Sequence, residues 1–286
     1  MSEKLHVSIS GSNFEEKPYR ADVCNICGSP KYRKIHYFEE FNLGRKLVKD
    51  VSIVRCRNCG VRRRMPEIID EYEVEYHSQF MKYGLAIHPH SLQHFTDLMT
   101  ARLRNLGAKD LAFLDVGCST GGVLRLAATL GFQVAGLDYS HWAVEHCAKL
   151  GFTTREGSLI GQWKESELFD IIHCSHTIEH VPDPVAYLKE MHRLLKPSGH
   201  LMLACPNYAS LQRLVMGKRW MWHLDSHLWQ FTAKQMKVLL GVCGFRPVSV
   251  RTLHGYMPNS RLKKKVLDVA AALGFSDGLN IVASRD

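Results

Sequence analysis

The stretch Leu114-Asp-Val-Gly-Cys-Ser-Thr-Gly-Gly122 decides the fold of this chain. It reads as an apolar strand that runs into a glycine-containing turn, and the turn opens a helix from Val123 to Leu130. Glycines at such a turn let the backbone pass close to a ligand, and the N-terminus of the helix adds unpaired N–H groups. We therefore expect the turn to hold a nucleotide-like cofactor.

Two carboxylates narrow the class of cofactor. A dinucleotide fingerprint also follows a strand and opens a helix, and Gly117 and Gly122 fit its spacing, but Ser119 replaces its middle glycine. Asp115 lies two residues before the first glycine and argues against a dinucleotide cofactor. Asp138 ends the next apolar strand, where a carboxylate can accept hydrogen bonds from ribose hydroxyls.

These residues resemble the class I S-adenosyl-L-methionine (SAM) methyltransferases, whose first motif reads acidic-x-Gly-x-Gly-x-Gly. Asp115, Gly117 and Gly121 match the motif, whereas Ser119 departs from it and leaves less room beside the cofactor. The family often holds the adenine amino group with an Asp near position 158; Ser158 stands here, so backbone groups and apolar contacts are expected instead. The resemblance implies cofactor contacts from Asp115, Gly117, Ser119, Gly121, Asp138, Ser158, Leu159 and Ser175.

Strands and helices alternate after this motif, which predicts an α/β domain with a mostly parallel sheet and helices on both faces. The resemblance implies a Rossmann-like sheet of seven strands whose last strand is antiparallel. The expected strands span residues 112–116, 133–137, 152–155, 169–174, 200–204, 246–253 and 279–284. A helix with Asp183 as its cap and Pro184 at its first position should extend until Lys-Pro-Ser-Gly199, and Thr232 should cap another helix that ends near Cys243.

Two Cys-x-x-Cys knuckles, Cys24-Asn-Ile-Cys27 and Cys56-Arg-Asn-Cys59, precede this domain and are each followed by glycine. Four thiolates from paired knuckles form the closed tetrahedral site typical of structural zinc. Alternating segments between the knuckles predict a β-ribbon. A redox-active Cys-x-x-Cys is the alternative, but it normally comes as a single pair near a βαβ unit.

The domain organisation follows from these motifs. We expect a polar tail over residues 1–21, a zinc ribbon over 22–66, a helical connector over 67–106 and a SAM-dependent methyltransferase domain over 107–286. In similar ribbon-bearing methyltransferases a tyrosine of the connector approaches SAM, and Tyr76 or Tyr83 could serve here. The absence of a long apolar run or a secretion signal favours a cytoplasmic protein, and the oligomeric state stays open.

The segment Glu179-His-Val-Pro-Asp-Pro184 is similar to that of small-molecule methyltransferases, including the ubiquinone-biosynthesis O-methyltransferase type. His176 and His180 follow the fourth strand and are the candidates for a catalytic base or for positioning the acceptor, because a neutral imidazole can remove a proton near pH 7. Each could equally be a packing histidine. We cannot assign the Tyr/Glu/His base cluster of zinc-ribbon sugar C-methyltransferases to residues of this sequence, which favours O-methylation.

An insertion over residues 206–231 should cover the substrate side of the sheet. It is rich in aromatic and basic residues, and its pattern resembles methyltransferases of glycan and secondary-metabolite pathways. The candidate acceptor contacts are Trp220, Trp222, His223, His227, Lys218 and Arg219, although the tryptophans could instead seal the core.

The net charge of +9 is uneven: residues 205–286 hold twelve Lys/Arg against four Asp/Glu, whereas residues 101–204 hold ten against eleven. A basic surface attracts phosphates, nucleic acids or anionic lipids, or is a solvated face. We expect a methyltransferase for a small, anionic sugar, metabolite, or nucleotide- or lipid-linked glycan. An rRNA or tRNA methyltransferase and a non-catalytic SAM-binding scaffold protein are the alternatives.

Overall fold

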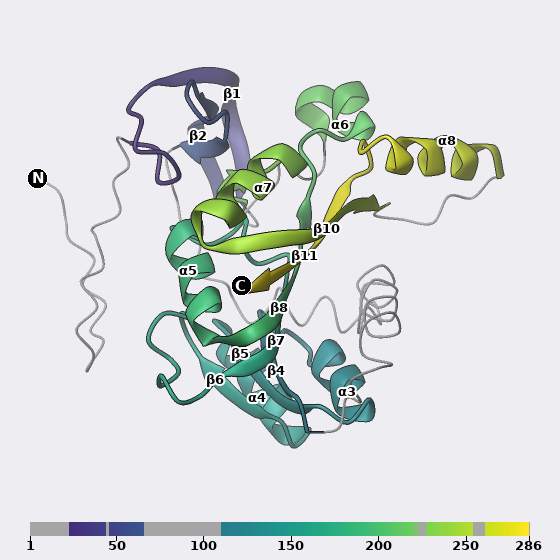
Figure 1. Ribbon diagram of the computed structural model, residues 1–286. Coiled ribbons are helices and arrows are strands. Elements are labelled where there is room, and N and C mark those ends of the chain that lie inside the picture. Colours follow the sequence, from purple (N-terminus) through teal and green to yellow (C-terminus); the bar gives the residue numbers. More distant parts are fainter. Residues whose placement is uncertain are drawn as a thin grey trace, which may run out of the picture.

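The computed structural model describes residues 23–43, 46–65, 110–220, 222, 227–253 and 261–285. They form two sheets, one of seven strands and one of four (Figure 1). The expected connector, with Tyr76 and Tyr83, and the expected N-terminal tail lie outside these residues, as does His223. In the part of the chain that is described, no helix is long and apolar enough to cross a membrane.

The seven-stranded sheet has the order β10-β11-β8-β7-β4-β5-β6. Strands β4, β5, β6, β7 and β8 are parallel, and β11 pairs antiparallel to both β8 and β10, which confirms the expected Rossmann-like sheet with its antiparallel last strand. The strands are β4 (Ala112–Val116), β5 (Gln133–Asp138), β6 (Thr153–Glu156), β7 (Phe169–Ser175), β8 (Leu195–Pro206), β10 (Phe245–Leu253) and β11 (Gly278–Arg285).

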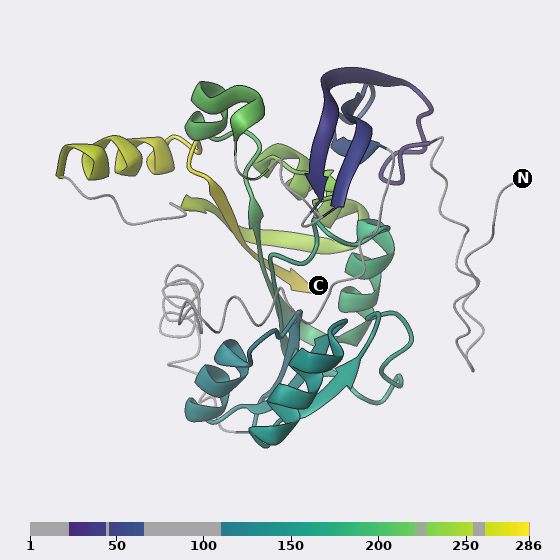
Figure 2. The ribbon, with the colours of Figure 1, turned by 180° about the vertical axis from the view of Figure 1, so that it is seen from behind.

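The chain steps from β4 to β5 and β6 in one direction along the sheet, and from β7 to β8 in the other. Because such crossovers are right-handed, helices cover both faces of the sheet. Helices α3 (Gly122–Thr129) and α4 (His141–Lys149) connect β4 to β5 and β5 to β6, whereas α5 (Pro184–Leu194) connects β7 to β8. Figures 1 and 2 show α5 and α7 (Ala233–Val242) on one side of the sheet and α3 on the other. The direction of winding reverses between β4 and β7, and ligands of open α/β sheets bind at the carboxyl ends of the strands at such a point.

Two helix starts are dictated by their capping residues. Asp183 accepts hydrogen bonds from the N–H groups of Val185 and Ala186, and Pro184 follows it. Thr232 and Gln235 form the expected capping box of α7. The end of α5 differs from the expectation: the helix stops at Leu194, and residues 195–199 already belong to β8, because Leu195 pairs with Phe169 of β7.

The four-stranded sheet has the order β1-β2-β3-β9. Strands β1 (Tyr32–Leu43), β2 (Lys46–Cys56) and β3 (Arg62–Met65) form the expected ribbon, and β9 (Trp229–Gln230) comes from the insertion. The insertion also contains α6 (Leu211–Met216), capped by Ser210, and a short 3-10 helix, η1 (Gly217–Arg219).

The ribbon shares its core with the larger domain. Cys24, Cys56 and Val61 belong to the same buried cluster as Trp229 and Phe231 of the insertion. The side chain of Gln235, in the capping box of α7, donates a hydrogen bond to the carbonyl of Gly60 in the second knuckle. The ribbon is therefore fixed to the insertion and to α7.

Candidate active site

The turn after β4 is tied to the end of β5. Gly117 and Gly121 have φ angles of +84° and +73°, a region that favours glycine, and Ser119 also has a positive φ, of +47°. The backbone N–H of Ser119 donates to Asp138 Oδ2 over 2.8 Å, and the N–H of Ser140 donates to Oδ1 over 2.9 Å. The glycine turn and the predicted ribose carboxylate are thus neighbours at the carboxyl edge of the sheet.

The loop after β6 closes one side of this region. The N–H of Gly157 donates to the carbonyl of Asp138, and Ser158 Oγ lies 3.2 Å from the hydroxyl of Tyr187 on α5. That hydroxyl also accepts from the N–H of Leu159 and lies 2.8 Å from the hydroxyl of Tyr139. Ser158 and Leu159 are held in place from α5, beside Asp138.

Tyr139 is a residue that the sequence reasoning missed. It follows Asp138 directly, and its side chain is exposed even though its hydroxyl is bonded to Tyr187. The signal was available, since an aromatic residue directly after the ribose carboxylate has a π face to offer to an adenine ring.

Asp115 is buried and pairs with His173, whose Nδ1 lies 2.7 Å from Asp115 Oδ1. The two residues face each other in the register of β4 and β7. Burial raises the pKa of Asp115, and the charge of His173 acts in the opposite direction. His173 could be identified only once the strand register was known.

A cluster of one carboxylate and three imidazoles lies beyond β7. The Glu179 side chain is 1% exposed, and His176 Nδ1, His180 Nε2 and His227 Nε2 lie 3.3, 4.0 and 4.0 Å from its Oε1. Among the described residues neither carboxylate oxygen of Glu179 accepts a hydrogen bond. A buried charge without donors is costly, so this carboxylate is set up to interact with a proton, a ligand or a cation.

The insertion supplies the other wall of this cluster. Trp222 stacks on His176 at 5.5 Å and on His227 at 5.9 Å between ring centroids, and His180 meets His227 edge to face at 4.7 Å. The N–H groups of Leu228 and Trp229 donate to the carbonyl of Glu179. The insertion thus contacts the loop that carries His176 and His180.

His227 is held in one orientation. Its Nδ1 lies 3.1 Å from the carbonyl oxygen of Trp222, which leaves Nε2 facing Glu179. Burial, and secondly the proximity of His180, lowers the pKa of His227 to about 3, so the ring is neutral at pH 7. One ligand atom from each of Glu179, His180 and His227 lies within 4.8 Å of the others, so these residues could hold a metal ion.

The remaining acceptor candidates are placed differently. Trp220 is buried against Tyr208, with ring centroids 5.9 Å apart, and Arg219 is exposed. Lys218 lies in η1 beside Arg219. Ser175, expected to touch the cofactor, ends β7 and is half-buried.

The four cysteines of the knuckles converge. Cys24 Sγ lies 3.6 Å from Cys59 Sγ, and Cys27 Sγ lies 3.6 Å from Cys56 Sγ. These separations exceed the roughly 2 Å of a disulfide and match the roughly 3.8 Å between the sulfurs of a tetrahedral zinc thiolate site. All four sulfurs lie within 4.8 Å of one another, a cluster compatible with structural zinc.

Comparisons with known proteins agree with this geometry. The family model described as a methyltransferase domain matches residues 89–250, more than half of the chain. The ubiquinone biosynthesis O-methyltransferase of Yersinia enterocolitica is 32% identical over 112 residues, which are 36% of this chain and 46% of the relative. That of Xanthomonas oryzae pv. oryzae is 34% identical over 121 residues, 39% of this chain and 48% of the relative. The chain spans about half the length of these curated relatives.

Among solved structures, the fold is similar to a chain in the complex between the Haloferax volcanii Trm112 methyltransferase activator and a methyltransferase. The TM-score is 0.59 at 16% identity, over 77% of this chain and 97% of that chain. At this level of identity the similarity concerns the fold.

Proposed function

We propose that this chain, which belongs to the methyltransferase-domain family, transfers a methyl group from SAM to a hydroxyl of a small-molecule acceptor. The observation that carries the proposal is the arrangement at the carboxyl edge of the sheet. The glycine turn and Asp138 lie on one side of the β4–β7 switch point, and the Glu179–histidine cluster lies on the other. The names of the curated relatives, which specify O-methylation, support a hydroxyl acceptor.

In this proposal the donor side is formed by the residues around Asp138. Gly117 and Gly121 let the backbone pass close to the cofactor, and Asp138 accepts hydrogen bonds from the ribose hydroxyls. Ser158 and Leu159 face the adenine. Tyr139 adds an exposed aromatic ring beside the ribose carboxylate. Asp115 and Ser175 complete the donor side.

The acceptor side uses His176 as the general base. When bound, SAM supplies the methyl group in an in-line displacement, which requires an aligned acceptor that can lose its hydroxyl proton. His176 is the most exposed imidazole of the cluster, with a side chain 38% accessible, and Glu179 lies beside its Nδ1. Nε2 is then the atom that takes the acceptor proton, and Glu179 stabilises the resulting imidazolium.

His180 and His227 have a second possible role. With Glu179 they fit a divalent cation, because no described residue donates a hydrogen bond to the carboxylate and the Nε2 of His227 faces it. Such a cation would lower the pKa of a bound acceptor hydroxyl. A chelator separates the two roles. A loss of activity that added Zn²⁺ restores would assign the cation, and unchanged activity would assign His176 alone.

The acceptor enters beside Trp222 and Arg219 and is small and anionic. The stacked aromatic surface of Trp222 and the basic η1 support this, because a sugar or an aromatic ring can stack while a phosphate or carboxylate pairs with the cations. An RNA acceptor and a non-catalytic scaffold are the competing functions.

The test measures S-adenosylhomocysteine formation with nucleotide-linked sugars, phenolic acids and transfer RNA as acceptors. We expect turnover with a small anionic acceptor, and His176→Gln and Glu179→Gln should each lower kcat by roughly 10²- to 10⁴-fold without changing SAM affinity. His141→Gln, on the exposed start of α4, is the matched control. Turnover with RNA alone, or full activity in both site variants, would refute the proposal.

A further inference from the structure

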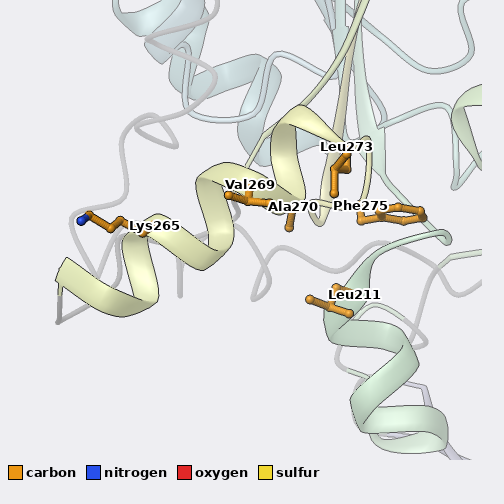
Figure 3. A pocket seen from close by; sticks show the side chains of 6 residues that line it. All are labelled: Leu211, Lys265, Val269, Ala270, Leu273 and Phe275. Atoms are coloured by element: carbon orange, nitrogen blue, oxygen red, sulfur yellow. The ribbon is translucent and has the colours of Figure 1, made fainter.

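An apolar surface lies between α6 and α8 (Arg261–Ala272), away from the site described above. Its most exposed members are Val215 at 81%, Leu273 at 65%, Val269 at 59% and Leu214 at 58%. Leu211, Ala270, Leu273 and Phe275 line a groove of about 410 Å³. Figure 3 shows these side chains, with Lys265 farther along α8. We call the exposed surface formed by Leu211, Leu214, Val215, Met216, Val269, Leu273 and Phe275 the α6–α8 face.

The α6–α8 face is a single body and not two independent segments. The N–H of Leu211, at the start of α6, donates to the carbonyl of Phe275 over 2.8 Å. The Asn207 side chain donates to the carbonyls of Gly274 and Ser276, and Thr252 Oγ1 donates to the carbonyl of Ala271. These bonds fix both helices to each other and to β10, so the exposed apolar residues are presented together.

The sequence of α8 is amphipathic and basic. Leu262, Val266 and Val269 recur at a spacing of four and three residues, which is the spacing of one stripe of a helix, and Leu273 directly follows the end of α8. Arg261, Lys263, Lys264 and Lys265 fill most of the first five positions of the helix, and its first turn holds no acidic residue. Cations at a helix N-terminus oppose the helix dipole, so helix stability does not account for this cluster.

We infer that the α6–α8 face docks on an anionic phospholipid surface. An apolar stripe beside clustered lysines is the combination that holds an amphipathic helix in the plane of a bilayer interface. The exposed apolar side chains would enter the acyl boundary, and the cluster at residues 261–265 would lie against the headgroups. α8 extends from the rest of the molecule in Figures 1 and 2, and this position leaves the helix accessible to a flat surface.

A second copy of the chain fits the α6–α8 face less well than a lipid surface does. In a two-fold dimer the same surface meets itself, so a second copy brings a second basic cluster and no matching acidic one. Within the sequence of α8 the one acidic residue is Asp268, against four basic residues. A bilayer that contains phosphatidylglycerol supplies the opposite charge and the apolar phase together.

The experiment is co-sedimentation of the full chain, without SAM or acceptor, with vesicles of phosphatidylcholine or of phosphatidylcholine mixed with phosphatidylglycerol. We expect binding to the mixed vesicles that weakens with salt. Neutralising Lys263, Lys264 and Lys265 to Gln should lower the partition coefficient about 100-fold, at about five-fold per lysine. Val269→Ser with Leu273→Ser should abolish binding. Val238→Ser with Val242→Ser, on the exposed side of α7, is the matched apolar control and should bind like the wild type.

Three results would overturn the inference. They are absence of binding to the mixed vesicles, unchanged binding after Val269→Ser with Leu273→Ser, and a dimer in solution that the same double substitution converts to a monomer. The last result would assign the face to a second copy. Because SAM binding and methyl transfer to a soluble acceptor use other residues, they should remain intact in these variants, so failure here leaves the proposed function untouched.

Discussion

At Gly117 the backbone requires glycine for two separate reasons. Its φ of +84° strains any residue with a Cβ, and a Cβ built there would overlap Thr177 Oγ1. Thr177 follows β7, and its hydroxyl donates to the carbonyls of Val116 and Ser175. The turn after β4 is therefore packed directly against the loop that carries His176 and Glu179, so one residue connects the donor and acceptor sides.

Gly117→Ala should cost more stability than Gly151→Ala. Gly151 has nearly the same φ, +89°, but nothing lies within 4 Å of its missing Cβ, so that variant reports backbone strain alone, about 1 kcal/mol. The overlap with Thr177 should add roughly 1–3 kcal/mol in Gly117→Ala. Urea unfolding of the two variants measures the difference. Equal losses would show that the Thr177 loop moves aside freely.

Among the elements, the pairing of β3 with β9 links the ribbon to the active site. Arg62 pairs with Gln230 and Arg63 with Trp229, and the N–H of Arg64 donates to the carbonyl of Leu228. The indole N–H of Trp229 in turn donates to the carbonyl of Val181. Through β9 the ribbon supports the segment that carries Trp222 and His227, so a structural metal would act indirectly on the proposed acceptor site.

Cys56→Ser should lower bound zinc well below one equivalent per chain. It should raise KM for the acceptor while SAM affinity is retained, because β3 of the ribbon pairs with β9 of the insertion. Cys243→Ser is a control, since Cys243 is a buried cysteine outside the cluster. Metal analysis and separate titrations of SAM and acceptor measure these effects. One full equivalent of zinc in Cys56→Ser would show that the four cysteines do not form the zinc site.

Elements that local sequence encodes were predictable, and elements that depend on distant partners were not. The apolar runs of β4, β5 and β7 and the capping residues Asp183 and Thr232 mark their elements within a few positions. β9 has two residues and exists because β3 pairs with it, so no local pattern reveals it.

The same limit applies to the site. The histidines of the fourth-strand segment were found by their position after an apolar strand. Glu179 was missed because its burial beside His227, with no hydrogen-bond donor among the described residues, becomes evident only in the folded chain. The pairing of Asp115 with His173 likewise required the register between β4 and β7.

Across the whole molecule, positive charge gathers in the part of the chain that contains the proposed acceptor side and the α6–α8 face. Residues 205–286 hold twelve Lys/Arg against four Asp/Glu, while the residues around the donor side are close to neutral. Charge placed in this way steers anions toward one side of a molecule, and the effect is screened over about 10 Å at 0.1 M salt.

Arg219→Glu, alone or with Lys218→Glu, should raise KM for an anionic acceptor and reduce the dependence of KM on salt, with SAM affinity unchanged. Lys149→Glu, on exposed α4, makes the same change of charge on the other side of the sheet and should leave KM unchanged. Steady-state kinetics at low and high salt measure the effect. Identical salt dependence in Arg219→Glu and the wild type would show that η1 does not contact the acceptor.

We propose that this chain binds SAM at the carboxyl edge of its sheet through Asp138. Isothermal titration calorimetry of the wild type, Asp138→Ala and Glu145→Gln with SAM tests it most directly, because Glu145 is an exposed carboxylate on the neighbouring α4. We predict one SAM per chain for the wild type and for Glu145→Gln, and at least a tenfold weaker Kd for Asp138→Ala, about 1.4 kcal/mol or more. No SAM binding by the wild type, or wild-type affinity in Asp138→Ala, would rule out a SAM site at Asp138.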